Sequence, residues 1–284
     1  MPGREDVLIS ATELAELLDA DAPVTILDVR WRLDQPDGSA AHAEGHIPGA
    51  VYVSLEDDLS DAELAGRGRH PLPRGGDLQE AARRWGVRQG VPVVVYDDWN
   101  RVGSGRAWWV LTAAGLTDVR ILDGGLDAWR AAGGRIDTGA VHPKPGDVTV
   151  SQDDLYAGDR LTVTAQQAAD GVMTLLDARP AERYRGDNEP ADAVAGHIPG
   201  AKNLPFAAVL AEDGTFLDED SLNALLADRD INRHGQVGVY CGSGVSATVP
   251  IAAIAALGRH AALFPGSWSQ WSSEPGRPVA RGDE

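Results

Sequence analysis

The sequence of 284 residues contains a single cysteine, Cys241. One thiol excludes an internal disulfide and a CxxC redox pair, so any thiol exchange at Cys241 must end on a second molecule. The HExxH motif is also missing, and the seven histidines show no metal-ligand spacing. We therefore expect neither a metal ion nor another cofactor.

Basic residues and long apolar runs are scarce as well. Lysine and arginine number 25 against 43 aspartates and glutamates, which gives a formal net charge of -18. Nucleic acids and anionic membrane surfaces attract positive charge, so neither is expected as a partner. No apolar run approaches the roughly 20 residues that span a bilayer, and the first residues lack a basic segment followed by an apolar core. These absences predict a cytoplasmic protein.

The surroundings of Cys241 favour a reactive thiol. The apolar stretch VGVY ends at this residue, and the helix-like stretch VPIAAIAAL follows after a short loop. Gly242 and Gly244 permit backbone angles closed to other residues, so the loop amides can turn toward the sulfur. These amides and the N-terminus of the helix should stabilise an anion there. A lone cysteine is more often a small buried hydrophobic residue, but the glycine loop favours a nucleophile.

The two halves of the chain repeat the same motifs. TILDVRW, AEGHIPGAVYV, VPVVVYDD and ILDGGLDAW in the first half match TLLDARP, VAGHIPGAKNL, QVGVYCGS and LFPGSWSQW in the second. Equivalent positions lie 142 to 151 residues apart, and all four motifs keep their order. This pattern indicates a duplicated domain.

Short Val/Ile/Leu runs alternate with helical patterns in each half. This alternation predicts an α/β fold in which each domain has a mostly parallel sheet with helices on both faces. We expect one domain over residues 1–136 and a second over 161–284. The segment between them, 137–160, is rich in Gly, Pro and Asp and is predicted to be a connector.

The nucleophile position differs between the halves. Ligands of open α/β sheets bind at the carboxyl ends of the strands, where Cys241 is expected. The matching residue after VVVY in the first half is Asp97. A carboxylate cannot replace a thiolate as a sulfur nucleophile, so the first domain should lack that role and should pack against the second domain and wall the site. His46 and His197 occur in both GHIPGA motifs and are therefore expected to be framework residues.

Together these motifs resemble the tandem-domain rhodanese family of sulfurtransferases. In that family a catalytic cysteine takes sulfur from thiosulfate or 3-mercaptopyruvate as a persulfide and passes it to cyanide or to a thiol acceptor such as thioredoxin. The resemblance implies two rhodanese-like domains, with Cys241 as the nucleophile of the second. It also implies that the backbone amides of the loop cradle the sulfur, namely those of Gly242, Ser243, Gly244, Val245 and Ser246.

The loop CGSGVS resembles the mercaptopyruvate type, because the thiosulfate type carries basic residues after the cysteine. Thiosulfate is a dianion, whereas 3-mercaptopyruvate has one carboxylate that a single arginine could bind. Arg183 matches the substrate-binding arginine of the family. The mercaptopyruvate type usually has a second arginine after the next Glu-Pro, but here Ala191 and Asp192 follow it. The donor preference for mercaptopyruvate is weakened by that difference.

The mercaptopyruvate type has also been assigned a proton relay. Ser243 matches its serine, His70 its histidine and Asp57 its acidic residue. Such a relay would deprotonate the incoming thiol or protonate the leaving enolate. Its histidine and acidic residue would both come from the first domain.

Two other functions compete with sulfur transfer. A cysteine phosphatase needs an arginine six positions after its nucleophile, and that position is Ala247. A persulfide carrier or redox-sensing protein would use Cys241 without turnover. Loading of sulfur without turnover would distinguish such a protein from an enzyme.

Overall fold

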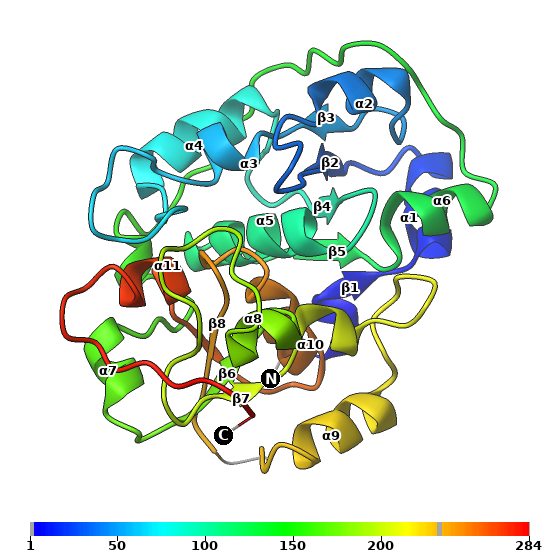
Figure 1. Ribbon diagram of the computed structural model, residues 1–284. Coiled ribbons are helices and arrows are strands. Elements are labelled where there is room, and N and C mark those ends of the chain that lie inside the picture. Colours follow the sequence, from blue (N-terminus) through cyan, green and yellow to red (C-terminus); the bar gives the residue numbers. More distant parts are fainter. Residues whose placement is uncertain (1–2, 232–234, 284) are drawn as a thin grey trace.

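The computed structural model describes residues 3–231 and 235–283, which form two α/β domains packed together (Figure 1). The first domain has a five-stranded sheet in the order β1-β5-β4-β2-β3, and the second has a four-stranded sheet in the order β7-β6-β8-β9. All strand pairs in both sheets are parallel. The predicted α/β fold with two sheet-containing domains is confirmed.

The strands are short, and most are buried, as their Val/Ile/Leu composition predicts; β7 is only half-buried. Those of the first domain are β1 (Leu8–Ile9), β2 (Thr25–Asp28), β3 (Val51–Tyr52), β4 (Val93–Tyr96) and β5 (Val119–Leu122). Those of the second are β6 (Thr174–Asp177), β7 (Lys202–Asn203), β8 (Val237–Tyr240) and β9 (Ala262–Leu263). The parallel bridge between Thr162 and Leu263 stands where the first domain has β1 beside β5.

Helices cover both faces of each sheet. The outer faces carry α1 (Ala11–Asp19) and α6 (Gly125–Ala131) in the first domain, and α7 (Ala165–Ala169) and α11 (Ser267–Trp271) in the second. The inner faces carry α4 (Gly75–Arg84) and α5 (Val102–Ala113), and α9 (Glu219–Ala227) and α10 (Thr248–Ala256). The remaining short helices are η1 (Arg4–Asp6), α2 (Ser39–Glu44), α3 (Leu55–Asp58), η2 (Leu155–Ala157), α8 (Ala181–Arg185) and η3 (Phe206–Val209). No helix of the described residues has both the length and the apolar character needed to cross a membrane.

The two inner helices α5 and α10 pack against each other at the centre of the molecule (Figure 1). Every residue of α10 is buried, because this helix lies between its own sheet and the first domain. One apolar core therefore runs without interruption through both domains. Such a junction holds the two domains in a fixed relation, which matters for a pocket formed between them.

The segment 137–160 runs along the first domain. Val148 is buried in the shared core, and its carbonyl accepts a hydrogen bond from Nε of Arg83 on α4 (2.9 Å). The Gly146 amide donates to the Arg83 carbonyl (2.8 Å). These contacts tie the segment to α4 before the chain enters the second domain.

Candidate active site

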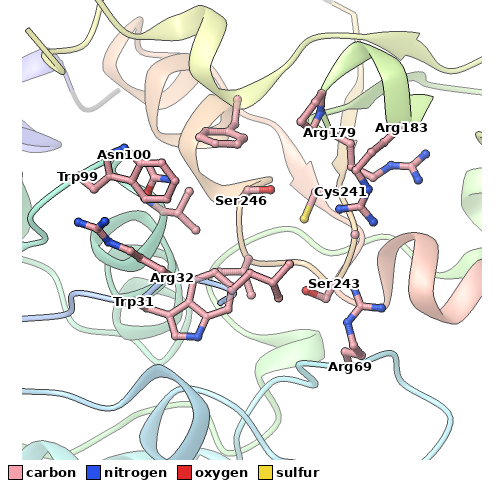
Figure 2. Close-up of a pocket in the computed structure, with 16 residues that line it drawn as sticks. Trp31, Arg32, Arg69, Trp99, Asn100, Arg179, Arg183, Cys241, Ser243 and Ser246 are labelled. Atoms are coloured by element: carbon pink, nitrogen blue, oxygen red, sulfur yellow. The ribbon is translucent and has the colours of Figure 1, made fainter. Parts of the chain in front are cut away.

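Cys241 directly follows β8 and borders a pocket between the two domains (Figure 2). The pocket has a volume of about 210 Å³, and only 1% of the Cys241 surface is exposed. The first domain contributes Trp31, Arg32, Leu33, Arg69, Trp99, Asn100 and Val102. The second contributes Arg179, Pro180, Arg183, Phe206, Cys241, Gly242, Ser243, Val245 and Ser246. Of the residues expected to bind the donor, all but Gly244 line this pocket.

The loop after Cys241 offers unoccupied hydrogen-bond donors. Within the described part of the chain, no protein acceptor takes the backbone N–H of any residue from Gly242 to Ser246. Gly244 has φ +78°, and a Cβ atom there would lie 2.3 Å from the Pro265 carbonyl oxygen, so this position requires glycine. Helix α10 begins just after the loop, at Thr248. Free amides and a helix N-terminus next to a thiol can stabilise a bound or developing anion.

The equivalent loop of the first domain is already filled. Asp97 follows β4, and its Oδ1 accepts hydrogen bonds from the amides of Trp99 (3.1 Å) and Arg101 (3.2 Å). Its Oδ2 accepts from both the amide (3.0 Å) and the hydroxyl (2.7 Å) of Ser104. The carboxylate of Asp97 therefore occupies the anion position of its own loop.

His70 joins the loop after Cys241 to a carboxylate of the first domain. Its Nδ1 lies 2.7 Å from Ser243 Oγ, and its Nε2 lies 3.1 Å from Glu56 Oε1. Burial lowers the pKa of His70, which favours the neutral ring. The carboxylate accepts a hydrogen bond from Nε2–H, so Nδ1 accepts one from the Ser243 hydroxyl. Trp31 Nε1 donates to the same Glu56 oxygen (2.8 Å) and fixes its position.

The structure places Glu56, and not the expected Asp57, in contact with His70. Asp57 does not contact His70; its Oδ2 accepts a hydrogen bond from Ser54 Oγ (2.7 Å), which in turn caps the Asp57 amide. Successive side chains of a helix point about 100° apart, so the turn that directs Asp57 to the cap of α3 directs Glu56 toward His70. The sequence SLEDDLSD does not show at which residue this four-residue helix begins, so it could not predict which acidic side chain faces His70.

Arg183 borders the pocket as expected and is held by acidic neighbours. Its Nη2 lies 2.5 Å from Glu189 Oε1 and 3.5 Å from Asp192 Oδ2. The ion pairs orient the guanidinium, and 14% of the side chain stays exposed.

Arg69 is a pocket residue that the sequence analysis missed. Its Nη1 pairs with Asp192 Oδ1 at 2.5 Å, across the domain boundary. A Cβ atom on Gly242 would lie 3.3 Å from Arg69 Nη2 and 3.5 Å from Arg183 Nη1, so two guanidinium groups flank the loop. Figure 2 shows the two side chains reaching the loop from different sides. The sequence feature that could have indicated a pocket position for Arg69 is that it directly precedes His70.

Arg179 also borders the pocket but belongs to the framework. It is fully buried and ion-paired to Asp177 (2.6 Å) and Glu189 (3.1 Å). Arg30 makes the same kind of pair with Asp28 in the first domain. A contact repeated in the domain without a thiol stabilises the fold of each domain.

The pocket is lined by guanidinium groups, each of which is ion-paired to a carboxylate that lies outside the lining. Arg32, Arg69, Arg179 and Arg183 border it, and no carboxylate is among its described lining residues. A pocket with such a lining attracts small anions. Its size and its single thiol fit a small anionic molecule that reacts with sulfur.

Comparison with known proteins gives the family. The model of the rhodanese-like domain matches residues 10–132 and again 162–274. A Mycobacterium tuberculosis protein with the provisional name thiosulfate sulfurtransferase SseB is 68% identical over 282 residues, which cover 99% of both chains. A Pseudomonas aeruginosa protein with the provisional name 3-mercaptopyruvate sulfurtransferase is 42% identical over 284 residues, covering 97% of this chain and 98% of that protein.

A solved structure agrees with the sequence matches. The crystal structure of SseA from Escherichia coli superposes with a TM-score of 0.80 at 32% identity. The superposition covers 92% of this chain and 98% of SseA. The chain therefore belongs to the rhodanese family and consists of two rhodanese-like domains, of which the second carries the thiol.

Proposed function

We propose that this protein is a sulfurtransferase that takes sulfur from 3-mercaptopyruvate, in preference to thiosulfate, and transfers it through a persulfide on Cys241. The reaction type is supported by relatives of nearly the same length that are named sulfurtransferases. Their names divide between the two donors, so the donor is argued from the site. The observation that carries the proposal is the contact between Ser243 Oγ and His70 Nδ1 beside the thiol.

The first half-reaction transfers one sulfur atom. The Cys241 thiolate attacks the donor sulfur, an S–S bond forms, and the bond from that sulfur to the rest of the donor breaks. From thiosulfate the leaving group is sulfite. From 3-mercaptopyruvate the C–S bond breaks with its electron pair on carbon, and the enolate takes up the former thiol proton to become pyruvate. Either donor leaves a persulfide anion on Cys241, which the free loop amides can stabilise.

A proton relay through Ser243, His70 and Glu56 is needed for 3-mercaptopyruvate but not for thiosulfate. The thiol of 3-mercaptopyruvate must lose its proton, and the leaving enolate must gain one. Ser243 can accept that proton while its own passes to His70 Nδ1, and Glu56 stabilises the resulting imidazolium. Thiosulfate brings no proton to remove, so a buried Ser-His-Glu relay at its sulfur would have no task. The relay therefore supports 3-mercaptopyruvate as the preferred donor.

The two flanking arginines would bind the donor's negative charge. Arg183 and Arg69 lie beside Gly242, and Nε of Arg69 has no hydrogen-bond partner within the described structure. A carboxylate placed there gains charge-assisted hydrogen bonds from both domains. Arg69 would thus serve in place of the arginine that is missing near Ala191.

The second half-reaction returns the thiolate. A thiol acceptor, such as that of thioredoxin, or cyanide attacks the outer sulfur, the S–S bond breaks, and Cys241 is released as a thiolate. The step requires Cys241 to stay reduced between turnovers, which the reducing cytoplasm favours. We therefore assign the protein to the cytoplasm. A carrier or redox sensor would load sulfur at Cys241 without this second step.

Intact mass and kinetics test the proposal together. Treatment with either donor should add the mass of one sulfur atom, about 32 Da, and Cys241→Ser should gain nothing. Initial rates with cyanide or thioredoxin should give parallel plots, and kcat/KM should be higher with 3-mercaptopyruvate. Loading without turnover would identify a carrier, and a higher kcat/KM with thiosulfate would overturn the donor assignment.

A further inference from the structure

Arg106 is a buried cation that connects the first domain to the catalytic loop. It lies on α5 with no measurable exposure, and its Nη1 donates to the Gly244 carbonyl at 3.1 Å. Its Nη2 donates to the carbonyls of Leu59 (2.9 Å), His70 (3.0 Å) and Pro71 (3.1 Å). A single guanidinium thus holds the backbone of both the cysteine loop and the relay histidine.

The charge of Arg106 has no carboxylate partner within the described residues. Buried arginines elsewhere in the chain do have one, as Arg30 pairs with Asp28 and Arg179 with Asp177. Burial lowers the pKa of Arg106 to about 10, so the group is still protonated at neutral pH. Carbonyl dipoles compensate part of the desolvation, but a buried cation is normally balanced by a nearby anion.

The anion that can balance Arg106 is the catalytic sulfur. Arg106 contacts Gly244, three residues after Cys241, and the negative charges that act on its cation are those of Tyr156, Cys241 and Glu56. Tyr156 is not ionised at neutral pH, because burial raises its pKa above the ordinary value. Arg106 does not line the donor pocket, and it contacts the cysteine loop through the Gly244 carbonyl.

We propose that Arg106 is a positioning residue that supplies the counter-charge for the Cys241 thiolate and persulfide. The proposal rests on the proposed role of Cys241 as the nucleophile. Other charged or titratable groups face the pair and would contribute less. They are Glu56, His70 and Tyr156 around Arg106, and Arg69, Arg179 and Arg183 around Cys241.

The location of the other arginines explains why Arg106 should dominate. Arg69 and Arg183 are partly exposed and already neutralised by Asp192 and Glu189. A charge in the protein interior acts through a lower effective dielectric and is little screened by salt. The first domain would therefore supply the positive charge that stabilises the Cys241 anion, although it has no thiol of its own.

Alkylation of the single thiol tests the proposal without depending on sulfur transfer. The rate of reaction with iodoacetamide is followed by intact mass from about pH 5 to pH 9, because only the thiolate reacts. Arg106→Met should move the midpoint of this profile upward by about one pH unit or more, which is a tenfold loss of thiolate on the acid side. Arg106→Lys keeps the positive charge and should move the midpoint by less than half of the shift expected for Arg106→Met.

Arg160→Met is the matched control. Arg160 is a second arginine whose pKa is lowered by burial, and its guanidinium stacks on Trp108 at 4.2 Å and donates to Thr112, away from the loop. Its removal should leave the alkylation midpoint unchanged. A folded Arg106→Met protein with the wild-type midpoint, or an equal shift in Arg160→Met, would overturn the proposal.

A salt titration of the wild-type protein keeps the test valid if Arg106→Met does not fold. Raising the salt concentration from about 0.05 to 1 M should move the midpoint by less than about 0.3 pH unit, because a buried counter-charge is poorly screened. A rise of about one unit would show that the exposed arginines dominate and would reject the role of Arg106. Normal alkylation shifts with no sulfur loading would instead reject only the proposed function.

Discussion

Asp97 and Cys241 occupy the same position in the two domains, directly after β4 and β8. The Asp97 carboxylate binds the amides of its own loop, whereas the amides after Cys241 are free within the described structure. The same backbone motif therefore stabilises a permanent anion in one domain and is available to a transient one in the other. This difference separates a structural loop from a reactive one.

Replacing Asp97 should destabilise the first domain without stopping sulfur loading. Asp97→Ala leaves the amides of Arg101 and Ser104 and the buried Arg101 cation without their partner, which should cost about 3–5 kcal/mol of unfolding free energy. Urea unfolding measures this loss, and intact mass measures the sulfur gained at Cys241. If a folded Asp97→Ala protein failed to load sulfur, the Asp97 loop would take part in the sulfur chemistry.

Removing the relay serine should separate the two donors. Ser243→Ala should lower kcat/KM for 3-mercaptopyruvate by roughly 10²–10⁴-fold, the range of general acid–base catalysis. With thiosulfate the change should stay within a few fold, because no proton is transferred. Steady-state kinetics with both donors check this result. Equal losses with the two donors would mean that Ser243 supports the loop rather than the proton transfer.

The neighbouring carboxylates Glu56 and Asp57 form a matched pair. Glu56→Gln removes the charge that stabilises the His70 imidazolium and should lower kcat with 3-mercaptopyruvate by at least about tenfold. Asp57→Asn alters only the cap of α3 and should leave kcat unchanged. Pre-steady-state release of pyruvate isolates the step concerned. A larger effect from Asp57→Asn would reverse the assignment of the relay.

Arg69 should contribute to donor binding from the first domain. Arg69→Met should raise KM for either anionic donor by roughly 10–100-fold, which corresponds to about 1.5–3 kcal/mol for a lost charged hydrogen bond. Arg67→Met is the control, because Arg67 stacks on Tyr156 at 4.6 Å and does not border the pocket. Unchanged KM in Arg69→Met would leave Arg183 as the principal binding residue.

The pH dependence of stability should report on His70. Burial lowers its folded pKa below the ordinary 6.5, so below that pH the unfolded chain binds a proton that the folded protein does not. The stability contributed by the neutral ring is complete above about pH 6.5, the pKa of the unfolded chain, and is lost as the pH falls from there through the lowered pKa of the folded protein. The difference in unfolding free energy between the wild type and His70→Asn should therefore shrink from about pH 7.5 to about pH 5. Urea unfolding at several pH values measures it; a constant difference would contradict a neutral buried ring.

The sequence was a sound guide wherever the evidence was local. The repeated motifs predicted the fold, and the apolar strand and the glycine loop predicted the place of Cys241 at the end of β8, because each depends on neighbours in the chain. His70 was also located, since the family resemblance supplied a partner for Ser243. The structure places these two residues in contact although 173 positions separate them.

Arg69 and Arg106 contact the second domain across the domain boundary and were not predictable from the sequence. Arg106 reaches the loop because α5 packs against α10, and nothing in the segment of either arginine indicates its contact. Glu56 was missed for a different reason. The orientation of two adjacent acidic residues depends on the start of α3, which one capping hydrogen bond from Ser54 decides.

The continuous core between α5 and α10 makes the two domains dependent on each other. His70 and Arg106 belong to one domain, and the loop that they contact belongs to the other. A fragment with residues 161–284 would retain the complete cysteine motif but would lack both partners. Duplication has thus produced a molecule that needs both domains. The second domain carries the thiol, but the loop around that thiol depends on contacts from the first.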